Sequence, residues 1–205
     1  MDDSPLHPFA DLVGFTPFAE GRDAEEVRDT LSRYFEVASE TIARYGGVVE
    51  KFIGDAVMAV WGAPVAHEDD ALRAVRAGLD ILTSLGQMVT SGPRPRARIG
   101  IHTGIVVAGT VGNDQKMDYT AIGDTTNLAA RLQSLATPGT ILISEATLAL
   151  LRGAFATEPA GPFEVKGKTE PASAHQVLGW AAREPTFSGE RGELTPLFGR
   201  EAELA

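Results

Sequence analysis

The stretch 48–62 constrains the fold of this chain more than any other. Within it, two runs rich in β-branched and aromatic residues flank Gly54 and Asp55. This arrangement predicts a β-hairpin, because glycine and aspartate tolerate the positive φ angles of a tight turn. The hairpin would hold the Asp55 carboxylate at its tip and the Lys51 ammonium in its first strand. Taken alone, these two side chains favour an ordinary turn aspartate and a solvated strand lysine.

A second acidic turn changes that interpretation. Residues 9–16 place Asp11 in a short apolar run. If both turns end on the same sheet, Asp11 and Asp55 come together, and two carboxylates form a site for a hard, oxygen-binding divalent cation. Pro8 stands immediately before this run. Because proline cannot donate a backbone hydrogen bond, we expect the strand that carries Asp11 to be short, over 9–13.

The properties of the whole chain exclude several classes of protein. With 205 residues, 43% of them hydrophobic and 22% charged, the chain suffices for one globular domain and a tail. The net charge of −10 argues against nucleic acid as a partner. Cysteine is absent, which excludes disulfides and thiolate sites. No segment reaches the ~20 apolar residues that span a bilayer, and the N-terminus does not resemble a signal peptide. We expect a cytoplasmic domain without membrane contact in this fragment.

Apolar periodicity predicts a mixture of helices and strands. Between Ala24 and Tyr45 apolar residues recur every three or four positions, which is typical of an amphipathic helix. Because antiparallel hairpins are mixed with such helices, the predicted fold class is α+β. Further helices are expected over 68–89, 125–136 and 144–151. Strands are expected over 9–13, 48–53, 56–61, 96–108, 117–122, 140–143, 163–166 and 174–178.

One predicted helix carries a candidate pair of polar groups. Asn127 and Arg131 are four residues apart, so they project from the same helix face. An amide and a guanidinium on one face suit a sugar or phosphate oxygen that develops negative charge. The more common alternative is an outward-facing polar stripe. Lys166 and Lys168 add cationic groups near the end of the chain. The alternative is a solvated basic loop, which would have the same sequence.

Other polar residues are interpreted as structural. The run 67–70 (His-Glu-Asp-Asp) could suggest metal ligands, but an acidic first turn that complements a helix dipole is the favoured explanation. His102 is interpreted as a hydrogen-bonded strand histidine, and Gly104 as a bulge or a close approach. The chain has no Walker loop, no dinucleotide-binding glycine motif and no nucleophile elbow. By themselves, the residues predict metal-assisted chemistry on a phosphorylated ligand.

Several motifs, in this order, resemble the catalytic domain of class III nucleotide cyclases. The resemblance covers about residues 9–178, and it implies a ferredoxin-like βαββαβ core with additional C-terminal strands and a helix. It implies a cyclase domain over 9–180. Residues 182–196 lack periodicity, so 181–205 is expected to be a linker, and the run 195–204 resembles the opening of ATPase modules that follow cyclase domains in some regulators. The motifs are Phe-Ala-Asp-Leu-Val-Gly-Phe-Thr (9–16), Glu-Lys-Phe-Ile-Gly-Asp-Ala-Val-Met-Ala (50–59), Arg-Ile-Gly-Ile-His-Thr-Gly (98–104), Tyr-Thr-Ala-Ile-Gly-Asp-Thr-Thr-Asn-Leu-Ala-Ala-Arg-Leu (119–132) and Glu-Val-Lys-Gly-Lys (164–168).

By that resemblance, the chain would be an adenylate cyclase. It would convert ATP into 3′,5′-cyclic AMP and pyrophosphate by in-line attack of the ribose 3′-hydroxyl on the α-phosphate. Asp11 and Asp55 would hold two Mg²⁺ or Mn²⁺ ions per active site, with the Leu12 carbonyl as an extra oxygen ligand. Asn127 would orient the ribose, and Arg131 would stabilise charge that builds on the α-phosphate.

The resemblance also assigns the residues that read the base. Lys51 would donate to a purine ring nitrogen and so select adenine, while Lys166 would contact the terminal phosphates. Thr120 stands at the second base-reading position, where many members have Asp. This Thr resembles the subgroup of soluble, bicarbonate-responsive adenylate cyclases, which suggests bicarbonate as an activator. Because a hydroxyl both donates and accepts, rejection of GTP would be weaker.

In the family, active sites form between two antiparallel subunits, which implies a homodimer with two shared sites. Asp11 and Asp55 of one chain would face the base-reading and α-phosphate residues of the other. One alternative is a catalytically idle nucleotide-binding regulatory module, and another is a cyclase with relaxed ATP/GTP specificity. A third, a diguanylate cyclase, lacks support because its Gly-Gly-Asp/Glu-Glu-Phe turn is missing. The presence of both metal aspartates, the Asn and the Arg favours the enzyme.

Overall fold

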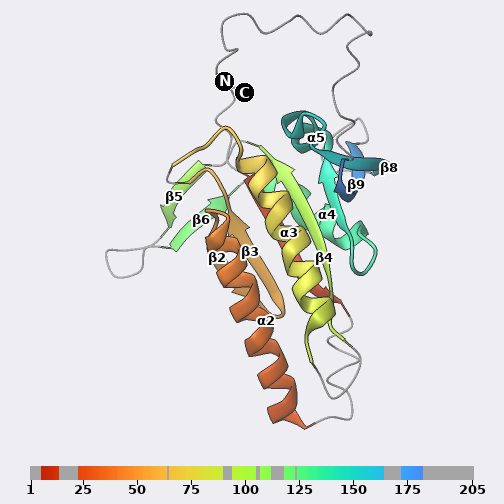
Figure 1. The fold of residues 1–205 in the computed structure, drawn as a ribbon. Helices are drawn as coiled ribbons and strands as arrows, with labels where there is room; N and C mark the ends of the chain where they lie inside the picture. The colour runs from red at the N-terminus through yellow and green to blue at the C-terminus, as the bar shows by residue number, and fades with distance from the viewer. Residues whose placement is uncertain are drawn as a thin grey trace, which may run out of the picture.

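Figure 1 shows the chain as a computed structural model. The structure describes residues 6–13, 23–63, 65–89, 94–104, 107–111, 118–122, 124–163 and 172–181. For residues 6–13, 107–111, 118–122 and 124 it describes the backbone alone.

The first half of the chain forms a βαββαβ unit. Its strands stand in the order β2-β3-β1-β4, and each neighbouring pair is antiparallel. This is the ferredoxin-like arrangement, so the predicted core is confirmed. Its elements are β1 (Leu6–Val13), α2 (Ala24–Arg44), β2 (Val48–Ile53), β3 (Ala56–Val60), α3 (Asp70–Gln87) and β4 (Arg96–Thr103).

The second half extends this sheet and adds a separate ribbon. Next to β4 lies β7, which is parallel to it, followed by β9 and β8, so that the sheet has seven strands. Among the described strands, β5 and β6 pair with each other and with no other strand. The predicted C-terminal additions to the core are thereby confirmed. The elements of this half are β5 (Val107–Val111), β6 (Asp118–Ile122), α4 (Asp124–Leu135), β7 (Ile141–Ser144), α5 (Glu145–Leu151), β8 (Phe155–Phe163) and β9 (Ala172–Trp180).

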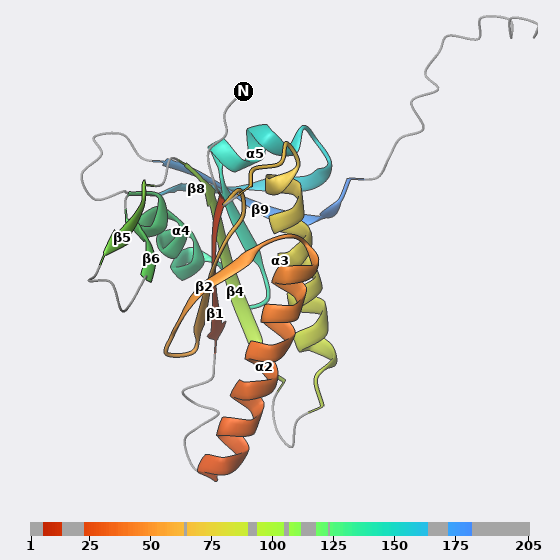
Figure 2. The ribbon, with the colours of Figure 1, turned by 90° about the vertical axis from the view of Figure 1, so that its left-hand side faces the viewer.

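Helices cover both faces of the large sheet. α2 and α3 pack on one face and α4 on the other (Figure 2). The core under α2 and α3 contains the fully buried side chains of Tyr34, Trp61, Leu85, Ile99 and Ile141. A smaller core under α4 contains Leu128, Leu132, Leu142 and Phe163. In the part of the chain that the structure describes, no helix has the length and apolar character needed to cross a lipid bilayer.

α4 rests directly on β4 because Gly100 has no side chain. A Cβ at Gly100 would lie 2.3 Å from the Ala129 carbonyl oxygen and 2.3 Å from the Gln133 nitrogen. Both atoms belong to the backbone of α4, so neither can move without moving the helix. At Gly104 a Cβ would meet the Thr125 hydroxyl at 2.6 Å, which confirms the predicted close approach there. These two glycines set the distance between α4 and the sheet.

Hydrogen bonds at the end of α2 connect the helical layer to the hairpin. The Tyr45 hydroxyl donates to Oδ2 of Asp80 on α3 at 2.8 Å. This bond, with burial as a smaller cause, raises the pKa of the Tyr45 hydroxyl. Nε1 of Trp61 donates to the Tyr45 carbonyl at 3.0 Å. Gly46, with φ +79°, then turns the chain into β2.

Four strand predictions were wrong in their limits, and one of them is β9, which spans Ala172–Trp180 rather than 174–178. β1 has eight residues rather than five, and it includes Pro8. A proline is tolerated there because β1 pairs with β4 along its whole length but with β3 only at Phe9 and Ala10. The strand expected over 96–108 ends at Thr103, and β5 begins separately. The strand expected over 163–166 is instead β8, which ends at Phe163. The predictions for 164–171 and for the linker 182–205 lie outside the described residues.

Candidate functional site

The β2–β3 hairpin positions Lys51 and Asp55 as the sequence predicts. Ile53 pairs with Ala56, which leaves Gly54 and Asp55 as the two turn residues. Gly54 has φ +63°, whereas no positive φ occurs at Asp55. Only the glycine therefore adopts the left-handed conformation, as in type II′ hairpins. Asp55 tolerates a positive φ but does not adopt one, because a type II′ turn needs a positive φ at its first central position only.

The strand register brings the two acidic turns together. In the β1–β3 pair, Phe9 lies opposite Met58 and Ala10 opposite Val57. Asp11 follows Ala10 on β1, and Asp55 immediately precedes β3, so the backbone of Asp11 lies near the hairpin turn that carries Asp55. The register is therefore compatible with a site that uses both carboxylates and the Leu12 carbonyl. Oxygen donors of this kind fit Mg²⁺ or Mn²⁺. No cluster of three or more His, Asp or Glu occurs among the described side chains, a set that does not include Asp11.

Next to this acidic end, β2 presents Lys51 and an unexpected partner. Nζ of Lys51 lies 3.4 Å from Oε1 of Glu50, the preceding residue. The side chain of Lys51 is 40% exposed, whereas that of Glu50 is only 6% exposed. Successive residues of a regular strand point to opposite faces, so a contact between neighbours requires an irregular strand. The register confirms this, since it shifts between Val49 and Lys51.

α4 carries Asn127 and Arg131 on its exposed face. Leu128 and Leu132 of the same helix are buried against the sheet, with 6% and 0% exposure. Asn127 and Arg131 lie on the opposite, exposed side of the helix. The helical spacing therefore places both polar groups together, as predicted. A polar helix face exposed only to solvent would have the same appearance in a single chain. The function of Asn127 and Arg131 therefore depends on whether a ligand or a second subunit contacts this face.

The remaining predicted residues are only partly described. Thr120 pairs with Gly109 in the β5–β6 ribbon, and β6 contacts α4. Lys166 lies outside the described residues, as do the side chains of Asp11 and Thr120. Two cavities in the described part of the chain are lined by other residues: one lies between α2, α3 and the sheet, the other between α4 and the β8–β9 pair. One chain thus places Lys51 and Asp55 on one hairpin, the backbone of Asp11 on the neighbouring strand β1, and Asn127 and Arg131 on a separate helix.

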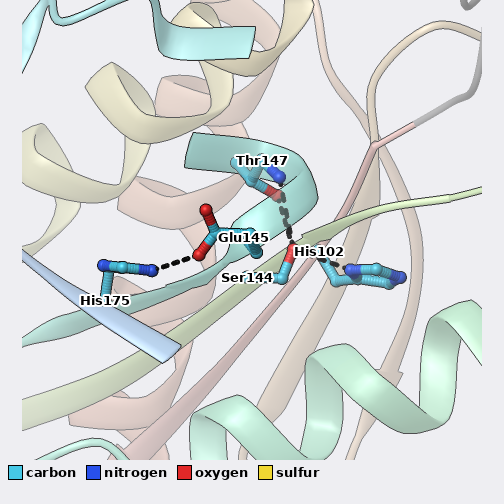
Figure 3. Close-up of polar contacts among 5 residues, drawn as sticks. All are labelled: His102, Ser144, Glu145, Thr147 and His175. Atoms are coloured by element: carbon cyan, nitrogen blue, oxygen red, sulfur yellow. Dashed lines mark hydrogen bonds and ion pairs between the residues drawn. The ribbon is translucent and has the colours of Figure 1, made fainter. Parts of the chain in front are cut away.

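A separate polar cluster holds α5 in place (Figure 3). Nδ1 of His102 shares a hydrogen bond with Oγ of Ser144 at 2.8 Å, which agrees with the interpretation of His102 as a structural strand residue. Ser144 is the N-cap of α5 and accepts from the Thr147 amide at 3.3 Å. At the surface, Nε2 of His175 on β9 lies 2.6 Å from Oε2 of Glu145. These contacts join β4, β9 and α5.

The run 67–70 occupies the start of α3. The buried Asp70 carboxylate accepts from the His67 amide at 2.7 Å. Oδ1 of Asp69 accepts from Nε of Arg73 at 2.8 Å. This bond is the main cause of a lowered pKa at the Asp69 carboxyl and a raised pKa at the Arg73 guanidinium. The two aspartates therefore take part in bonds at the first turn of the helix, as the sequence suggests.

Sequence reasoning missed two residues near the site. Glu50 was part of a motif but was given no role, and a one-residue register shift leaves no signal in the sequence. Gly100 lies in the motif Arg-Ile-Gly-Ile-His-Thr-Gly, and a glycine inside an apolar strand could have been recognised as a close approach of another backbone.

The chain belongs to a family of nucleotide cyclases. Residues 8–179 match the family model of the adenylate and guanylate cyclase catalytic domain. Adenylate cyclase 1 of Rhizobium meliloti (strain 1021) is 38% identical over 178 residues, which is 83% of this chain and 27% of that protein. The chain spans about a quarter of the length of the curated relatives it matches.

Solved structures support the same assignment. The guanylate cyclase domain of RhGC from Catenaria anguillulae, in complex with GTP, has a TM-score of 0.80 at 32% identity. This match covers 87% of this chain and 97% of that one. The adenylyl cyclase CyaB from P. aeruginosa has a TM-score of 0.79 at 34% identity and covers 88% and 96%. Since a guanylate and an adenylyl cyclase match almost equally well, the fold defines a nucleotide cyclase domain without defining its substrate.

Proposed function

We propose that this domain is an adenylate cyclase that converts ATP into 3′,5′-cyclic AMP and pyrophosphate. The observation that carries the proposal is Lys51, a partly exposed ammonium that stands four residues before Asp55 in the hairpin. An ammonium has only donors, and N1 of adenine offers a lone pair where N1 of guanine carries a hydrogen. A fixed lysine at this point therefore favours adenine. The 38% identity to a protein named adenylate cyclase 1 supports the same substrate.

In the proposed reaction, the ribose 3′-oxygen forms a bond to the α-phosphorus while the bond from that phosphorus to the β-bridging oxygen breaks. The proton of the 3′-hydroxyl is lost, and pyrophosphate leaves. Asp11 and Asp55, with the Leu12 carbonyl, hold two Mg²⁺ or Mn²⁺ ions. When bound, such ions supply positive charge that favours loss of this proton and offsets the charge of the triphosphate.

The other residues bind and orient the substrate. Asn127 holds the ribose, and Arg131 donates to the α-phosphate oxygens, which gain charge in the transition state. Thr120 meets the purine beside Lys51, and Lys166 meets the terminal phosphates. All four groups are neutral or positive, as a tetraanionic nucleotide requires. The exposed positions of Asn127 and Arg131 on α4 support this assignment.

We also propose that the active sites are shared in a homodimer. Asp11 and Asp55 of one subunit face Lys51, Asn127 and Arg131 of the partner subunit. The exposed positions of Asn127 and Arg131 on α4 leave these side chains open to a second copy. The apolar side chains of the hairpin support it as well, since Val48, Phe52 and Ile53 are 52%, 49% and 49% exposed. A twofold axis then creates two equivalent sites.

The direct test is product formation by the purified chain, with ATP or GTP and with Mn²⁺ or Mg²⁺. We expect cyclic AMP to form faster than cyclic GMP, and activity to vanish in Asp55→Ala. Activity per chain should rise with protein concentration as the dimer forms. Absence of both products from a folded dimer would support the idle regulatory module instead. Equal rates with ATP and GTP would support the cyclase with relaxed specificity.

Mixing two inactive variants tests the shared sites. Asp55→Ala and Arg131→Ala each damage a different half of the proposed site. Random pairing at equal amounts gives half heterodimers, each with one intact site of two, so roughly a quarter of the wild-type activity should return. No recovery, despite exchange of subunits shown by size or labelling, would contradict a site shared between chains.

The proposed bicarbonate response rests on Thr120 alone. Turnover should rise with bicarbonate at fixed pH and fixed ionic strength. A flat titration would remove this activator from the proposal without affecting the cyclase assignment.

A further inference from the structure

A β-bulge at Glu50 places two neighbouring side chains on the same side of β2. Val49 pairs with Ala59, and Lys51 pairs with Met58, so Glu50 is the additional residue on β2. A bulge of this kind interrupts the alternation of side chains and redirects them. The result is the 3.4 Å contact between Nζ of Lys51 and Oε1 of Glu50. Without the bulge, the two side chains would point to opposite faces of the sheet.

Burial distinguishes this pair from an ordinary surface ion pair. The Glu50 side chain is 6% exposed, so its carboxylate has little water around it. A carboxylate in such a place is stabilised by a nearby cation and in turn restricts where that cation can be. The Lys51 side chain remains 40% exposed, so its ammonium stays open to a ligand. An ammonium has three donors, so an ion pair with one carboxylate leaves donors open to a ligand.

We propose that Glu50 is a positioning residue that fixes the Lys51 ammonium for base reading, so that the preference for ATP over GTP depends on Glu50 as well as on Lys51. This inference rests on the proposed function, in which Lys51 reads the purine. It assigns a role to a residue that contacts Lys51 and not the nucleotide.

The physical reason is the flexibility of lysine. Its four-carbon side chain is mobile, and a mobile ammonium can move away from the N1–H of guanine and tolerate it. An ammonium held by a nearly buried carboxylate cannot move away, so guanine brings two donors against each other. Specificity of this kind depends on leaving the wrong ligand with an unpaired polar group. Glu50 thus converts a positive charge near the base into a directed donor.

The test compares Glu50→Gln with the wild type. Glutamine has almost the same shape but no charge, so it weakens the hold on Lys51 with little change in packing. We expect kcat with ATP to stay within about twofold, KM for ATP to rise, and the ATP/GTP ratio of kcat/KM to fall about two- to tenfold. In a Lys51→Met background, Glu50→Gln should have no further effect on that ratio. The matched control is Glu158→Gln, an exposed glutamate on β8 at the other edge of the sheet, which should leave the ratio unchanged.

A second measurement reads Lys51 without catalysis. Acylation of lysines by an amine-reactive ester, followed by peptide mass spectrometry, should show Lys51 reacting several times faster in Glu50→Gln than in the wild type. Competition of ATP and GTP for a fluorescent nucleotide gives the binding preference independently of turnover. Thermal unfolding and size measurement show whether the variant keeps its fold and assembly.

These measurements separate failure of this inference from failure of the proposed function. Wild-type protein without cyclase activity would overturn the proposed function, while Lys51 labelling and nucleotide competition would still test Glu50. An unchanged ATP/GTP preference in folded Glu50→Gln, together with a preference lost in Lys51→Met, would overturn the role of Glu50. Unchanged labelling of Lys51 would do the same. If Glu50→Gln unfolds, Glu50→Asp provides the same test, because aspartate keeps the carboxylate charge but its shorter side chain holds that charge farther from Lys51.

Discussion

The two edges of the seven-stranded sheet are built in opposite ways. At one edge, β2 presents the exposed apolar side chains of Val48, Phe52 and Ile53 and contains no proline. At the other, β8 contains Pro159 and Pro162 and pairs with β9 through two register shifts. Prolines and irregular pairing prevent an edge strand from accepting another strand.

This difference separates a protected edge from an edge available for binding. An edge strand that exposes apolar side chains and contains no proline is an aggregation hazard unless something covers it. The same hairpin carries Lys51, Asp55 and the Glu50 bulge, so the exposed edge carries residues of both proposed half-sites. Such a coincidence is expected where a second subunit both covers the apolar side chains and completes the site. The following predictions test this comparison, from the largest expected effect to the smallest.

The largest effect on stability should come from β4, a central strand that lies between the two edges of the sheet. Gly100→Ala places a methyl group 2.3 Å from two backbone atoms of α4, so the helix must move. We expect a loss of about 3 kcal/mol in the free energy of unfolding, measured by denaturant titration. The control is Gly86→Ala in α3, where a Cβ would meet nothing within 4 Å; it should stabilise the protein by about 0.5–1 kcal/mol. Equal effects of the two changes would contradict the close packing of α4 on β4.

The next largest effect, on dimer stability, should distinguish the β2 edge of the sheet from the β8 edge. Ile53→Ser removes an exposed apolar side chain from the hairpin, and twofold symmetry doubles its effect on association. We expect about 2 kcal/mol of lost dimer stability, roughly thirtyfold in the dissociation constant, measured by analytical ultracentrifugation. Leu178→Ser on β9 is the control, because Leu178 is 55% exposed and β9 lies next to the β8 edge of the sheet. A dimer weakened by Leu178→Ser and not by Ile53→Ser would reverse the comparison.

A smaller effect should arise in the helical layer, away from either edge. Tyr45→Phe removes the hydrogen bond to Asp80 and should cost about 1 kcal/mol of unfolding free energy at neutral pH. The pKa of Tyr45 is raised, first by that bond and then by burial, from the ordinary value of 10.0. The contribution is therefore fully present below that value and is lost as the pH rises through the raised pKa. Unfolding measured from neutral to alkaline pH should show the wild type losing its advantage over the variant, with the ATP/GTP ratio unchanged. An advantage that persists in alkali would contradict this assignment.

The smallest effect should come from the surface pair at the start of α3. Asp69→Asn removes an ion pair whose side chains are 50% and 34% exposed, so we expect a cost of a few tenths of a kcal/mol, about 0.3 kcal/mol. The pKa of Asp69 is lowered, mainly by its bond to Arg73. The contribution is therefore present above the ordinary pKa of 3.8 and is lost as the pH falls through the lowered value. Thermal unfolding in acid and at neutral pH should show the difference only at neutral pH. A cost above about 1 kcal/mol would contradict the interpretation of Asp69 and Arg73 as an exposed surface ion pair.

The sequence by itself determined much of the architecture. The apolar spacing between Ala24 and Tyr45 predicts α2 within one residue, and Gly54 with Asp55 predicts the hairpin turn. These features depend on local chemistry: the period of an amphipathic helix, the φ angle that glycine allows and the polar groups that cap an end. The ordered motifs add the family, because their combination is far more specific than any one of them.

Only the tertiary structure decided which strands meet and in what register. Pro8 predicts a short first strand, but the pairing of β1 with β4 on one side gives the proline a place where no donor is needed. The bulge at Glu50 depends on how β2 pairs with β3, and the contact of Gly100 with α4 depends on Ala129 and Gln133, which are distant in the sequence. A one-residue shift between two strands changes every side chain that follows it and leaves no local trace. For this reason the sequence names Lys51 and Asp55, and the fold shows that Glu50 stands beside the lysine.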